Sequence, residues 1–272
     1  MKVDPNGGEE ARSLVRNLDS TVVNPPPKNH KENSMKTLFS TLVLALSLSC
    51  AAENAAAPAA KSESLFNGKD LSGWDGNPTF WKVEDGAITA ESGGANPCHK
   101  TTFLVLKDRV VADFDITFKF RFLSDWANSG LQFRSKLADA KSFDVTGYQA
   151  DMEMGKDYTG ILYEQGGRGI FVNRGDRKEV DAAGQAKVTG HFDVSKVAQL
   201  EKGRWYTYHV VAKGSHMIQE IDGVRTMECV DEDAKHRAAS GILALQIHGG
   251  PAMKVQFKDI LFTELKAEAA KP

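Results

Sequence analysis

The residues best suited to chemistry form a short row in which polar side chains recur at every second position. The row consists of Gln149, Asp151 and Glu153, separated by neutral residues. On a β-strand, a period of two places the three polar side chains on one face of the sheet and the intervening residues on the other. Two carboxylates and an amide on one face can form the floor of a polar cleft and supply acid–base groups. A solvated outer face of a sheet is the alternative at this point.

Two further segments carry polar residues opposite an apolar stripe. Gln132 and Arg134 alternate with apolar positions in one segment, and Gln246 and His248 do the same in another. If these strands are neighbours of the first row, one surface of the sheet holds Arg134, Gln149, Asp151, Glu153, Gln246 and His248. Such a surface can make the many directional hydrogen bonds that a sugar requires. The pattern therefore favours a carbohydrate groove.

A glycine-rich segment gives a second group of candidates. Tyr163 and Glu164 end a predicted strand and lead into a loop that holds Arg168 among three glycines. Glycines let the backbone turn and let it approach a ligand closely. The loop lacks the Lys-Ser/Thr ending of a phosphate-binding loop and opens no helix, so a nucleotide site is not predicted. A plain surface hairpin is the alternative.

The tryptophans differ in what their contexts predict. Trp126 lies beside Asn128 in a predicted loop and is the best candidate for stacking on a sugar ring. Trp81 and Trp205 occur in strand-like segments, so we expect them in the core.

The elements that must position these residues are short strands separated by turn signals, with little helical periodicity. Asp85-Gly86 and Asp222-Gly223 predict the turns of two hairpins. Residues 113–122 alternate cleanly and form a core stripe of phenylalanines and one isoleucine. About a dozen strands without repeats indicate an all-β fold, in which two antiparallel sheets pack face to face as a jelly-roll sandwich.

Composition limits the class of partner. The 272 residues are 41% hydrophobic and 26% charged, which suffices for a full core in one large domain. The 34 basic and 36 acidic residues give a formal charge of -2 and are interspersed. This balance argues against nucleic acid or an anionic membrane surface as a partner. Neutral, polar ligands fit better.

The N-terminal part of the chain is typical of an exported bacterial protein. Met35 begins a short basic start, an apolar run and a small-residue end, which together predict a secretory signal peptide. The apolar run is too short for a comfortable membrane span. The expected divisions are a mis-called or disordered extension (1–34), the signal peptide (35–51), an Ala-rich linker (52–63), the sandwich (64–265) and a disordered tail (266–272). We therefore expect a periplasmic or cell-surface protein.

The cysteines leave two questions open. Cys50 follows a small residue in the form of a lipoprotein signal, so a lipid anchor at Cys50 competes with ordinary cleavage near Ala51 or Ala57. In an oxidising compartment Cys98 and Cys229 can form a disulfide or remain two buried thiols. No Cys/His spacing is typical of a zinc site.

Seven segments occur in an order that is specific for a known family. They are residues 65–74, 80–88, Asn128-Ser-Gly-Leu-Gln-Phe-Arg134, Gly147-Tyr-Gln-Ala-Asp151, 159–163, 241–249 and 255–260. Together they resemble the 3-keto-disaccharide hydrolase family, long known as a domain of unknown function. The resemblance implies a concanavalin A-like sandwich of the lectin and glucanase type, export in many members, and cleavage of glycosides whose sugar is oxidised at C3.

The implied fold also resembles that of secreted β-glucanases, whose active strand carries Glu-x-Asp-x-Glu with the first Glu as nucleophile. Here the row reads Gln149-x-Asp151-x-Glu153. An amide cannot serve as a carboxylate nucleophile, so retaining hydrolysis by double displacement is disfavoured. A ketone at C3 instead acidifies the proton at C2. A general base can then remove that proton, and the aglycone can leave C1 by elimination.

This chemistry gives each candidate a hypothetical role. The catalytic candidates are Asp151, Glu153, His248, Glu164 and Tyr163, and the substrate-binding candidates are Arg134, Gln149, Gln246, Arg168, Gln132 and Trp126. Asp151 or Glu153 is the expected base, with His248 as the competing candidate. Arg134 is expected to stabilise the enolate. Glu164, Tyr163 or His248 would protonate the leaving group.

Three alternatives remain open. A divalent ion held by Asp151, Glu153 and His248 could polarise the ketone, because oxygen and nitrogen ligands suit a hard or borderline cation. The same groove could also belong to a non-catalytic carbohydrate-binding lectin. A structural domain of the cell envelope is the third alternative.

Overall fold

The computed structural model describes residues 61–197 and 199–266, which belong to the second of two compact units, Ala55–Pro272. The expected N-terminal extension, signal peptide and lipid anchor at Cys50, and nearly all of the linker and tail, lie outside the described residues. Within the described part of the chain, no helix is long and apolar enough to cross a membrane.

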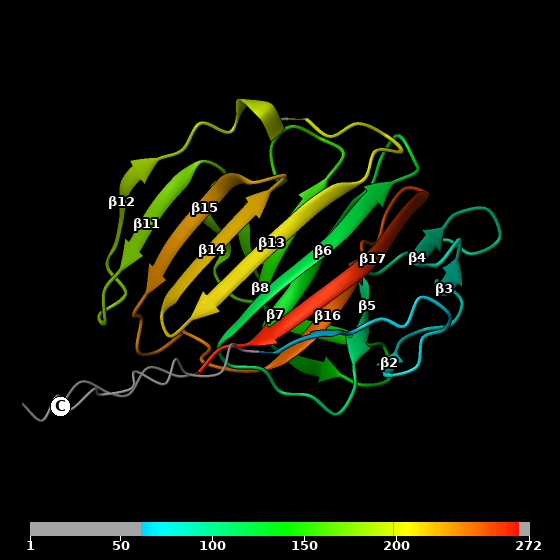
Figure 1. Cartoon of the computed structure of the whole chain (residues 1–272), viewed down its shortest axis with the longest axis horizontal. Coiled ribbons are helices and arrows are strands. Elements are labelled where there is room, and N and C mark those ends of the chain that lie inside the picture. The colour runs from blue at the N-terminus through cyan, green and yellow to red at the C-terminus, as the bar shows by residue number, and fades with distance from the viewer. Residues whose placement is uncertain (1–60, 198, 267–272) are drawn as a thin grey trace, which may run out of the picture. The chain divides into compact units, whose positions relative to one another are not determined.

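The described residues form two large sheets that lie one over the other (Figure 1). The ten-stranded sheet has the order β12 (Ala186–His191), β11 (Asp176–Val180), β15 (Val224–Asp231), β14 (His216–Ile221), β13 (Tyr206–Lys213), β6 (Phe114–Phe122), β17 (Met253–Glu264), β4 (Ala87–Ser92) and β3 (Trp81–Glu84), with β1 (Ser62–Ser64) paired to β17. The seven-stranded sheet has the order β10 (Gly169–Val172), β9 (Leu162–Gln165), β8 (Asp144–Glu153), β7 (Asn128–Asp139), β16 (Ile242–Ile247), β5 (Thr102–Leu106) and β2 (Trp74–Asp75).

This architecture confirms the predicted all-β sandwich. β11 and β15 pair in parallel, whereas the strands at the centre of each sheet pair antiparallel. A single 3-10 turn, η1 (Ser195–Val197), interrupts the β-structure of the described residues. The expected dozen strands is an underestimate, because 17 are present among the described residues and several, such as β1 and β2, are too short to show a period in the sequence.

The core lies between the two sheets and begins with the phenylalanine stripe. In β6 every second residue is buried, from Phe114 to Phe122, as the alternation predicts. The seven-stranded sheet contributes Tyr148 and Met152 from the opposite side. The ring of Phe118 stacks on that of Tyr208 with centroids 5.4 Å apart. Burial of so many large aromatic rings is the main source of stability for the sandwich.

The two turns predicted at Asp-Gly pairs are correct. Both Asp-Gly pairs join hairpin strands with positive φ at Asp85, Gly86, Asp222 and Gly223, which suits this turn chemistry. The sandwich starts at β1, two residues before the expected boundary.

Two predictions about buried residues have different outcomes. Trp81 is buried in the core, but Trp205 is only half-buried and lies between the cations of Arg121 and Lys258 on the outer face of the ten-stranded sheet. Of the two states left open for Cys98 and Cys229, the structure has two free, buried thiols. Burial raises the pKa of the Cys229 thiol to about 12, so this group is inert as a nucleophile at neutral pH.

The outer face of the seven-stranded sheet divides into an apolar half and a polar half. Phe103, Val105, Val145 and Ala244 form a small buried cluster of their own on one half. The other half is crossed by a row of directly paired residues in the order Ile170, Tyr163, Gln149 and Gln132, and this row meets the apolar cluster at Ala244 of β16. Directly paired residues share a face, so this register brings polar side chains from several strands together.

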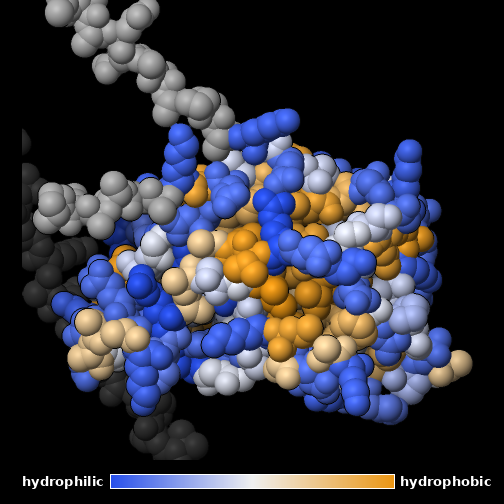
Figure 2. Space-filling model, turned by 90° about the horizontal axis from the view of Figure 1, so that it is seen from below, coloured by the Kyte–Doolittle hydropathy of each residue, from blue (hydrophilic) through white to orange (hydrophobic). Residues whose placement is uncertain are grey.

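Apolar side chains also reach the surface of the sandwich. Figure 2 shows many of them gathered on the face seen from below, among charged residues. The large hydrophobic residues that are clearly exposed are Val110, Leu137, Tyr158, Ile170, Val188 and Leu261. Single exposed apolar residues are normal on a protein surface. Their positions relative to a pocket decide whether they have a function.

Candidate functional site

A pocket of about 250 Å³ opens on the polar half of the seven-stranded sheet. We call it the sheet pocket, and its lining consists of Asn128, Gln149, Asp151, Tyr158, Ile161, Tyr163, Gln165, Ile170, Gln246 and His248. These residues come from β7, β8, β9, β10 and β16 and from the segments that follow β8 and β16. The structure thus gathers five of the sequence candidates in one place: Gln149, Asp151, Tyr163, Gln246 and His248.

The floor of the pocket is a network of buried amides centred on Gln149. Its Oε1 accepts hydrogen bonds from Gln132 Nε2 at 2.6 Å and from Gln246 Nε2 at 3.0 Å. Its Nε2 donates to Asp151 Oδ1. The three glutamines are almost fully buried, so these bonds are needed to satisfy their amides. The network fixes the orientation of Asp151, which carries the only carboxyl group among the described residues that line the pocket.

The amide network depends on a glycine in the strand between its two ends. Gln149 and Gln246 lie on β8 and β16, which are separated by β7, so their side chains must meet above that strand. Gly130 of β7 is paired with Asp151 and leaves the necessary space. A Cβ at position 130 would lie only 2.5–2.7 Å from three atoms of the Gln149 side chain. Any larger residue at position 130 would displace the amide.

Asp151 is the acid of the sheet pocket, and the residue as a whole is only 5% exposed. Burial raises its pKa to about 8, the hydrogen bond from Gln149 opposes this rise, and the nearby charge of Glu153 adds to it. No Lys or Arg is among the described residues that line the pocket, so no cation neutralises the carboxylate there. Asp151 therefore holds its proton near neutral pH, unlike an ordinary aspartate.

His248 and Tyr163 complete the set of groups that can move a proton in the pocket. The Nδ1 atom of His248 lies 2.7 Å from the carbonyl oxygen of Gly249, which favours the tautomer with the proton on Nδ1 and leaves Nε2 as an acceptor. The ring of Trp126 meets the His248 ring edge to face, with centroids 6.0 Å apart. Trp126 thus supports His248 and is not part of the pocket lining, which differs from the expected stacking role.

Glu153 shares a face with Asp151 in sequence but has a different partner. Its Oε1 accepts backbone hydrogen bonds from Tyr158 at 3.1 Å and from Asp157 at 3.3 Å. The hydroxyl of Thr159 donates to the Glu153 carbonyl oxygen. The carboxylate thus holds the loop after β8 and does not line the sheet pocket. The strand pattern could not reveal this, because the loop that claims the carboxylate has no periodic signal.

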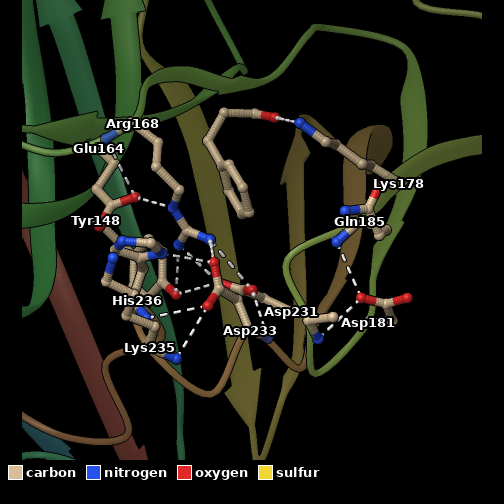
Figure 3. A network of polar contacts seen from close by, with 12 residues as sticks. Tyr148, Glu164, Arg168, Lys178, Asp181, Gln185, Asp231, Asp233, Lys235 and His236 are labelled. Carbon is tan, nitrogen blue, oxygen red and sulfur yellow. Dashed lines mark hydrogen bonds and ion pairs between the residues drawn. The ribbon is translucent and has the colours of Figure 1, made fainter.

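Glu164 and Arg168 also lie outside the pocket lining, in a network that joins the two sheets (Figure 3). Arg168 forms ion pairs with Glu164 and with Asp231 of β15, the latter at 2.7 Å. The Tyr148 hydroxyl donates to the same buried Asp231. Burial alone would lower the pKa of Arg168, but its hydrogen bonds to Asp231 and Glu164 outweigh burial and raise it. Arg168 is therefore a permanent cation that ties the β9–β10 hairpin to the facing sheet.

Arg134 is the sequence candidate that lies farthest from its expected environment. It has a positive φ of 47° at an irregularity in the pairing of β7 with β8, and this redirects its side chain. The guanidinium is buried, donates to the carbonyl oxygens of Ala112 and Gly214, and pairs with Asp113 at 2.9 Å. The expectation that Arg134 stabilises an enolate in the groove is wrong, because its donors are occupied elsewhere.

The metal alternative required three residues to converge. Within the described residues, no group of three or more His, Cys, Asp or Glu side chains is placed to hold a metal ion. Asp151 and His248 line the pocket, but Glu153 is held by backbone amides of its own loop. The three expected ligands are therefore not assembled as one site.

Several pocket residues were not expected from the sequence. Gln165 follows Tyr163 by two positions on β9 and so shares its face, a signal that the sequence did contain. Asn128 is paired with Glu153 at the start of β7. Tyr158 and Ile170 had no comparable signal, because one is in a loop and the other in a four-residue strand.

Comparison with known proteins gives a family and a fold. Residues 61–263 match the family of the 3-keto-alpha-glucoside-1,2-lyase-like domain. A putative glycosyl hydrolase from Parabacteroides distasonis is similar in structure, with 18% identity, a TM-score of 0.50 and coverage of 75% of this chain and 94% of that chain. The carbohydrate-binding module CBM66 from Bacillus subtilis has 16% identity and a TM-score of 0.47, covering 71% of this chain and 96% of that chain.

A third similar structure is the alginate lyase Aly36B, with 12% identity and a TM-score of 0.45 over 79% of this chain and 100% of that chain. At such identities the likeness concerns the sandwich fold alone. No curated protein matches the chain.

Proposed function

The chain belongs to the family of the 3-keto-alpha-glucoside-1,2-lyase-like domain, and on that premise we propose that it cleaves 3-keto-glycosides by elimination across C1 and C2. The family, which is the one expected from the sequence, supports a carbohydrate-acting protein. The sheet pocket suits such a ligand, because its amides offer directional donors and acceptors. No Lys or Arg is among the described residues of its lining.

The observation that carries the proposal is the state of Asp151. A carboxylate that is buried in a pocket without a cation is a stronger base than an ordinary aspartate, since its pKa is raised to about 8. Removal of a proton next to a ketone needs such a base. A pKa near the working pH also lets the group return the proton easily, so Asp151 suits general-base chemistry better than Glu153, which accepts backbone hydrogen bonds.

The proposed reaction balances without any oxidant or reductant. The C2–H bond breaks and its proton goes to the Asp151 carboxylate. The electron pair of that bond forms the double bond between C1 and C2, while the C1–O bond to the aglycone breaks. The leaving oxygen takes a proton from Tyr163 or from a protonated His248. Water can then add across the double bond, which gives the free 3-keto-sugar.

The charge that develops on the ketone oxygen needs a hydrogen-bond donor. With Arg134 committed elsewhere, the amide N–H groups of Gln246 and Asn128 at the pocket are the best candidates. Gln149 orients Asp151 and so acts as its positioning residue.

The proposal is tested with a chromogenic glucoside and its 3-keto counterpart. We expect release of the chromophore from the keto form only, with solvent deuterium appearing at C2 of recovered substrate or product. Asp151→Asn should lower kcat by about 10²- to 10⁴-fold, as expected for loss of a general base. Glu153→Gln, which keeps an acceptor oxygen for the loop, should retain most of the rate. Equal losses in both variants, or cleavage of the unoxidised glucoside, would refute the assignment.

A non-catalytic carbohydrate-binding domain is the second candidate, and the buried amide floor favours it. Gln149 and Gln246 line the pocket and can hold sugar hydroxyls without doing chemistry, while Gln132 lies behind them and orients Gln149. In that case Asp151→Asn would change the affinity for a sugar, and no 3-keto-glycoside would be turned over.

Two expectations from the sequence also stand as proposals. Export to the periplasm or cell surface follows from residues 35–51, and fractionation of cells that express the full chain tests it. A divalent ion was expected at Asp151, Glu153 and His248; because its own loop holds Glu153, an ion in the pocket would keep Asp151 and His248, whose oxygen and nitrogen atoms suit it. Loss of activity on chelation, with recovery on addition of the metal, would support the ion.

A further inference from the structure

The sheet pocket has a polar floor and an apolar rim. Its floor consists of buried amides and Asp151, whereas Tyr158 and Ile170 in its lining are 43% and 48% exposed. Exposed apolar side chains are common singly, but here two of them border the same small pocket. Apolar groups that stay in contact with water beside a pocket are suited to meet an apolar part of a ligand.

The rim residue Tyr158 is held in place by the carboxylate of Glu153. Its backbone N–H donates to Glu153 Oε1 at 3.1 Å, and the neighbouring Thr159 hydroxyl donates to the Glu153 carbonyl oxygen at 2.8 Å. The side chain of Tyr158 is thus presented by a loop that is fastened at its base. Glu153 thus acts as a positioning residue for Tyr158 and does not need to touch the reacting atoms.

The rim residue Ile170 is held by the network shown in Figure 3. Its neighbour Phe171 is buried beneath the guanidinium of Arg168, which lies 3.7 Å from the ring centroid. Arg168 is in turn paired with the buried Asp231 of the facing sheet. The pairing of β10 with β9 is irregular between Ile170 and Val172, so Phe171 and Val172 both pack inward, whereas Ile170 is paired directly with Tyr163 and shares its face. The exposure of Ile170 is therefore built into the hairpin.

The size of the pocket separates floor from rim. Its volume of about 250 Å³ lies below the range of about 300–1,000 Å³ typical for drug-sized ligands and suits one sugar ring. Along the paired row, Gln149 of the floor is followed by Tyr163 and then by Ile170 at the edge. A ring seated on the floor therefore has the rim beside it, on the side of β9 and β10.

We propose that Tyr158 and Ile170 form an apolar subsite for the leaving group, so that preferred substrates carry an aromatic or aliphatic aglycone and not a second sugar. The inference rests on the proposed function, since it concerns the leaving group of that reaction. Hydroxyl groups of a second sugar would lose water against Ile170 without gaining a hydrogen bond there. An apolar aglycone gains from the same contact.

The experiment compares two 3-keto-glucosides of the same anomeric configuration whose leaving groups are both primary alcohols. One carries cyclohexylmethanol and the other carries a second glucose linked through its O6 atom, so shape and leaving-group chemistry are similar. Rates are normalised to the methyl 3-keto-glucoside. We expect kcat/KM to favour the cyclohexylmethyl compound by about 10-fold, the size of effect that one apolar contact surface gives.

Variants assign that preference to the rim. Ile170→Asn and Tyr158→Ser should each bring the ratio of the two kcat/KM values closer to 1:1. Leu261→Asn is the matched control, because Leu261 is also 48% exposed but belongs to β17 of the other sheet, and its ratio should stay at the wild-type value. Equal rates for the two substrates, a preference for the disaccharide, or an unchanged ratio in both rim variants would overturn the proposal.

A binding measurement separates failure of the rim from failure of the proposed function. If no keto-glucoside is cleaved, the proposed function fails, and the rim is tested by calorimetry with the unoxidised cyclohexylmethyl and methyl glucosides. Tighter binding of the cyclohexylmethyl compound by wild type, lost in Ile170→Asn and kept in Leu261→Asn, supports the apolar subsite. Equal binding of the two glucosides, or no binding, overturns it.

Discussion

The outer faces of the two sheets both carry polar side chains with a period of two, but they satisfy those side chains differently. On the ten-stranded sheet, Glu220 pairs with Arg225 and His209, and all three side chains are about a quarter to a third exposed. On the seven-stranded sheet, Asp151 is buried and its carboxyl group accepts a hydrogen bond from the neutral amide of Gln149. The outer face of the ten-stranded sheet thus carries a network of charge pairs, whereas that of the seven-stranded sheet holds Asp151 beside a neutral amide.

The difference appears in the direction of the pKa shifts. Burial raises the pKa of Glu220, but hydrogen bonds from Arg225 and His209 outweigh burial, so the net shift is downward. Burial also raises the pKa of Asp151, and no cation opposes it, so the net shift is upward to about 8. Alternating polarity alone therefore does not identify a functional face. What separates the two faces is the presence or absence of an opposite charge beside each acid.

The largest expected effect of this contrast concerns the pH dependence of stability. The pKa of Asp151 rises from an ordinary 3.8 to about 8 in the folded protein, so its contribution is fully favourable below pH 4 and is lost as the pH rises toward 8. The loss is at most about 6 kcal/mol, since each pH unit between the two pKa values corresponds to about 1.4 kcal/mol. Activity that needs the carboxylate should rise over the same range.

Urea unfolding at pH 5 and pH 9 checks this. Wild type should lose stability between the two values relative to Asp151→Asn, whose amide does not titrate. Glu228→Gln on the outer face of the other sheet is the matched control for removing a carboxylate. It should not become more stable than wild type at pH 9, as Asp151→Asn should, because the pKa of Glu228 is lowered. Parallel pH profiles for wild type and Asp151→Asn would show that Asp151 is not a buried, unpaired acid.

The second largest effect concerns the network behind the pocket. Arg168→Met leaves the buried Asp231 without its cation, and breaking such a pair by removing one partner costs about 3–5 kcal/mol. Arg177→Met is the control, because Arg177 pairs with Glu228 on the outer face and is 47% exposed, so its loss should cost under about 1 kcal/mol. Urea unfolding measures both.

Hydrogen exchange tests whether the effect of Arg168→Met is local. Protection of β9 and β10 should fall more than that of β13, which lies in the centre of the other sheet. Uniform loss of protection, or equal losses of stability in the two arginine variants, would contradict the role of Arg168 as the tie between the β9–β10 hairpin and the facing sheet.

The third effect concerns the glycine that permits the amide network. Gly130→Ala places a Cβ within 2.7 Å of the Gln149 side chain, so the amide must leave its position and Asp151 loses its orienting donor. We expect activity to fall about 10-fold, as for a misplaced catalytic group. Gly190→Ala is the control, because a Cβ there has no neighbour closer than 3.7 Å and should leave activity unchanged. Retained activity in Gly130→Ala would show that the Gln149 amide is dispensable.

The sequence predicted the sandwich and the floor of the pocket for the same physical reason. Strand alternation is strictly local, so it places Gln149 and Asp151 on the outer face and Phe114 in the core without knowledge of the rest of the fold. Alternation predicts only the face of the sheet on which a side chain lies, and this prediction is correct for Gln246 and His248 as well.

The sequence could not predict what each side chain contacts beyond its own face. Arg134 departs from the pattern because an irregularity in β7 turns it toward the other sheet, and such irregularities have no reliable local signal. Glu153 is claimed by backbone amides of a loop, and Arg168 by an acid 63 positions later in the chain. These partners depend on tertiary structure. The position of Tyr158 at the rim of the pocket depends on it too, because Tyr158 lies in a loop.

The smallest expected effect tests the charged face of the comparison. Glu220→Gln removes a partly exposed partner of Arg225 and His209, so it should cost only about 0.5 kcal/mol at pH 7. Because the folded pKa of Glu220 is lowered, this contribution is present above its ordinary value of 4.5 and is lost as the pH falls through its folded value. The cost should therefore be smaller at pH 3 than at pH 9, opposite in sign to the trend for Asp151. Differential urea unfolding of Glu220→Gln and wild type at these two values measures it, with the activity on a 3-keto-glycoside unchanged. A cost that grows as the pH falls would mean that the charged face holds strained acids of the same kind as the pocket, and the contrast between the two faces would no longer mark the site.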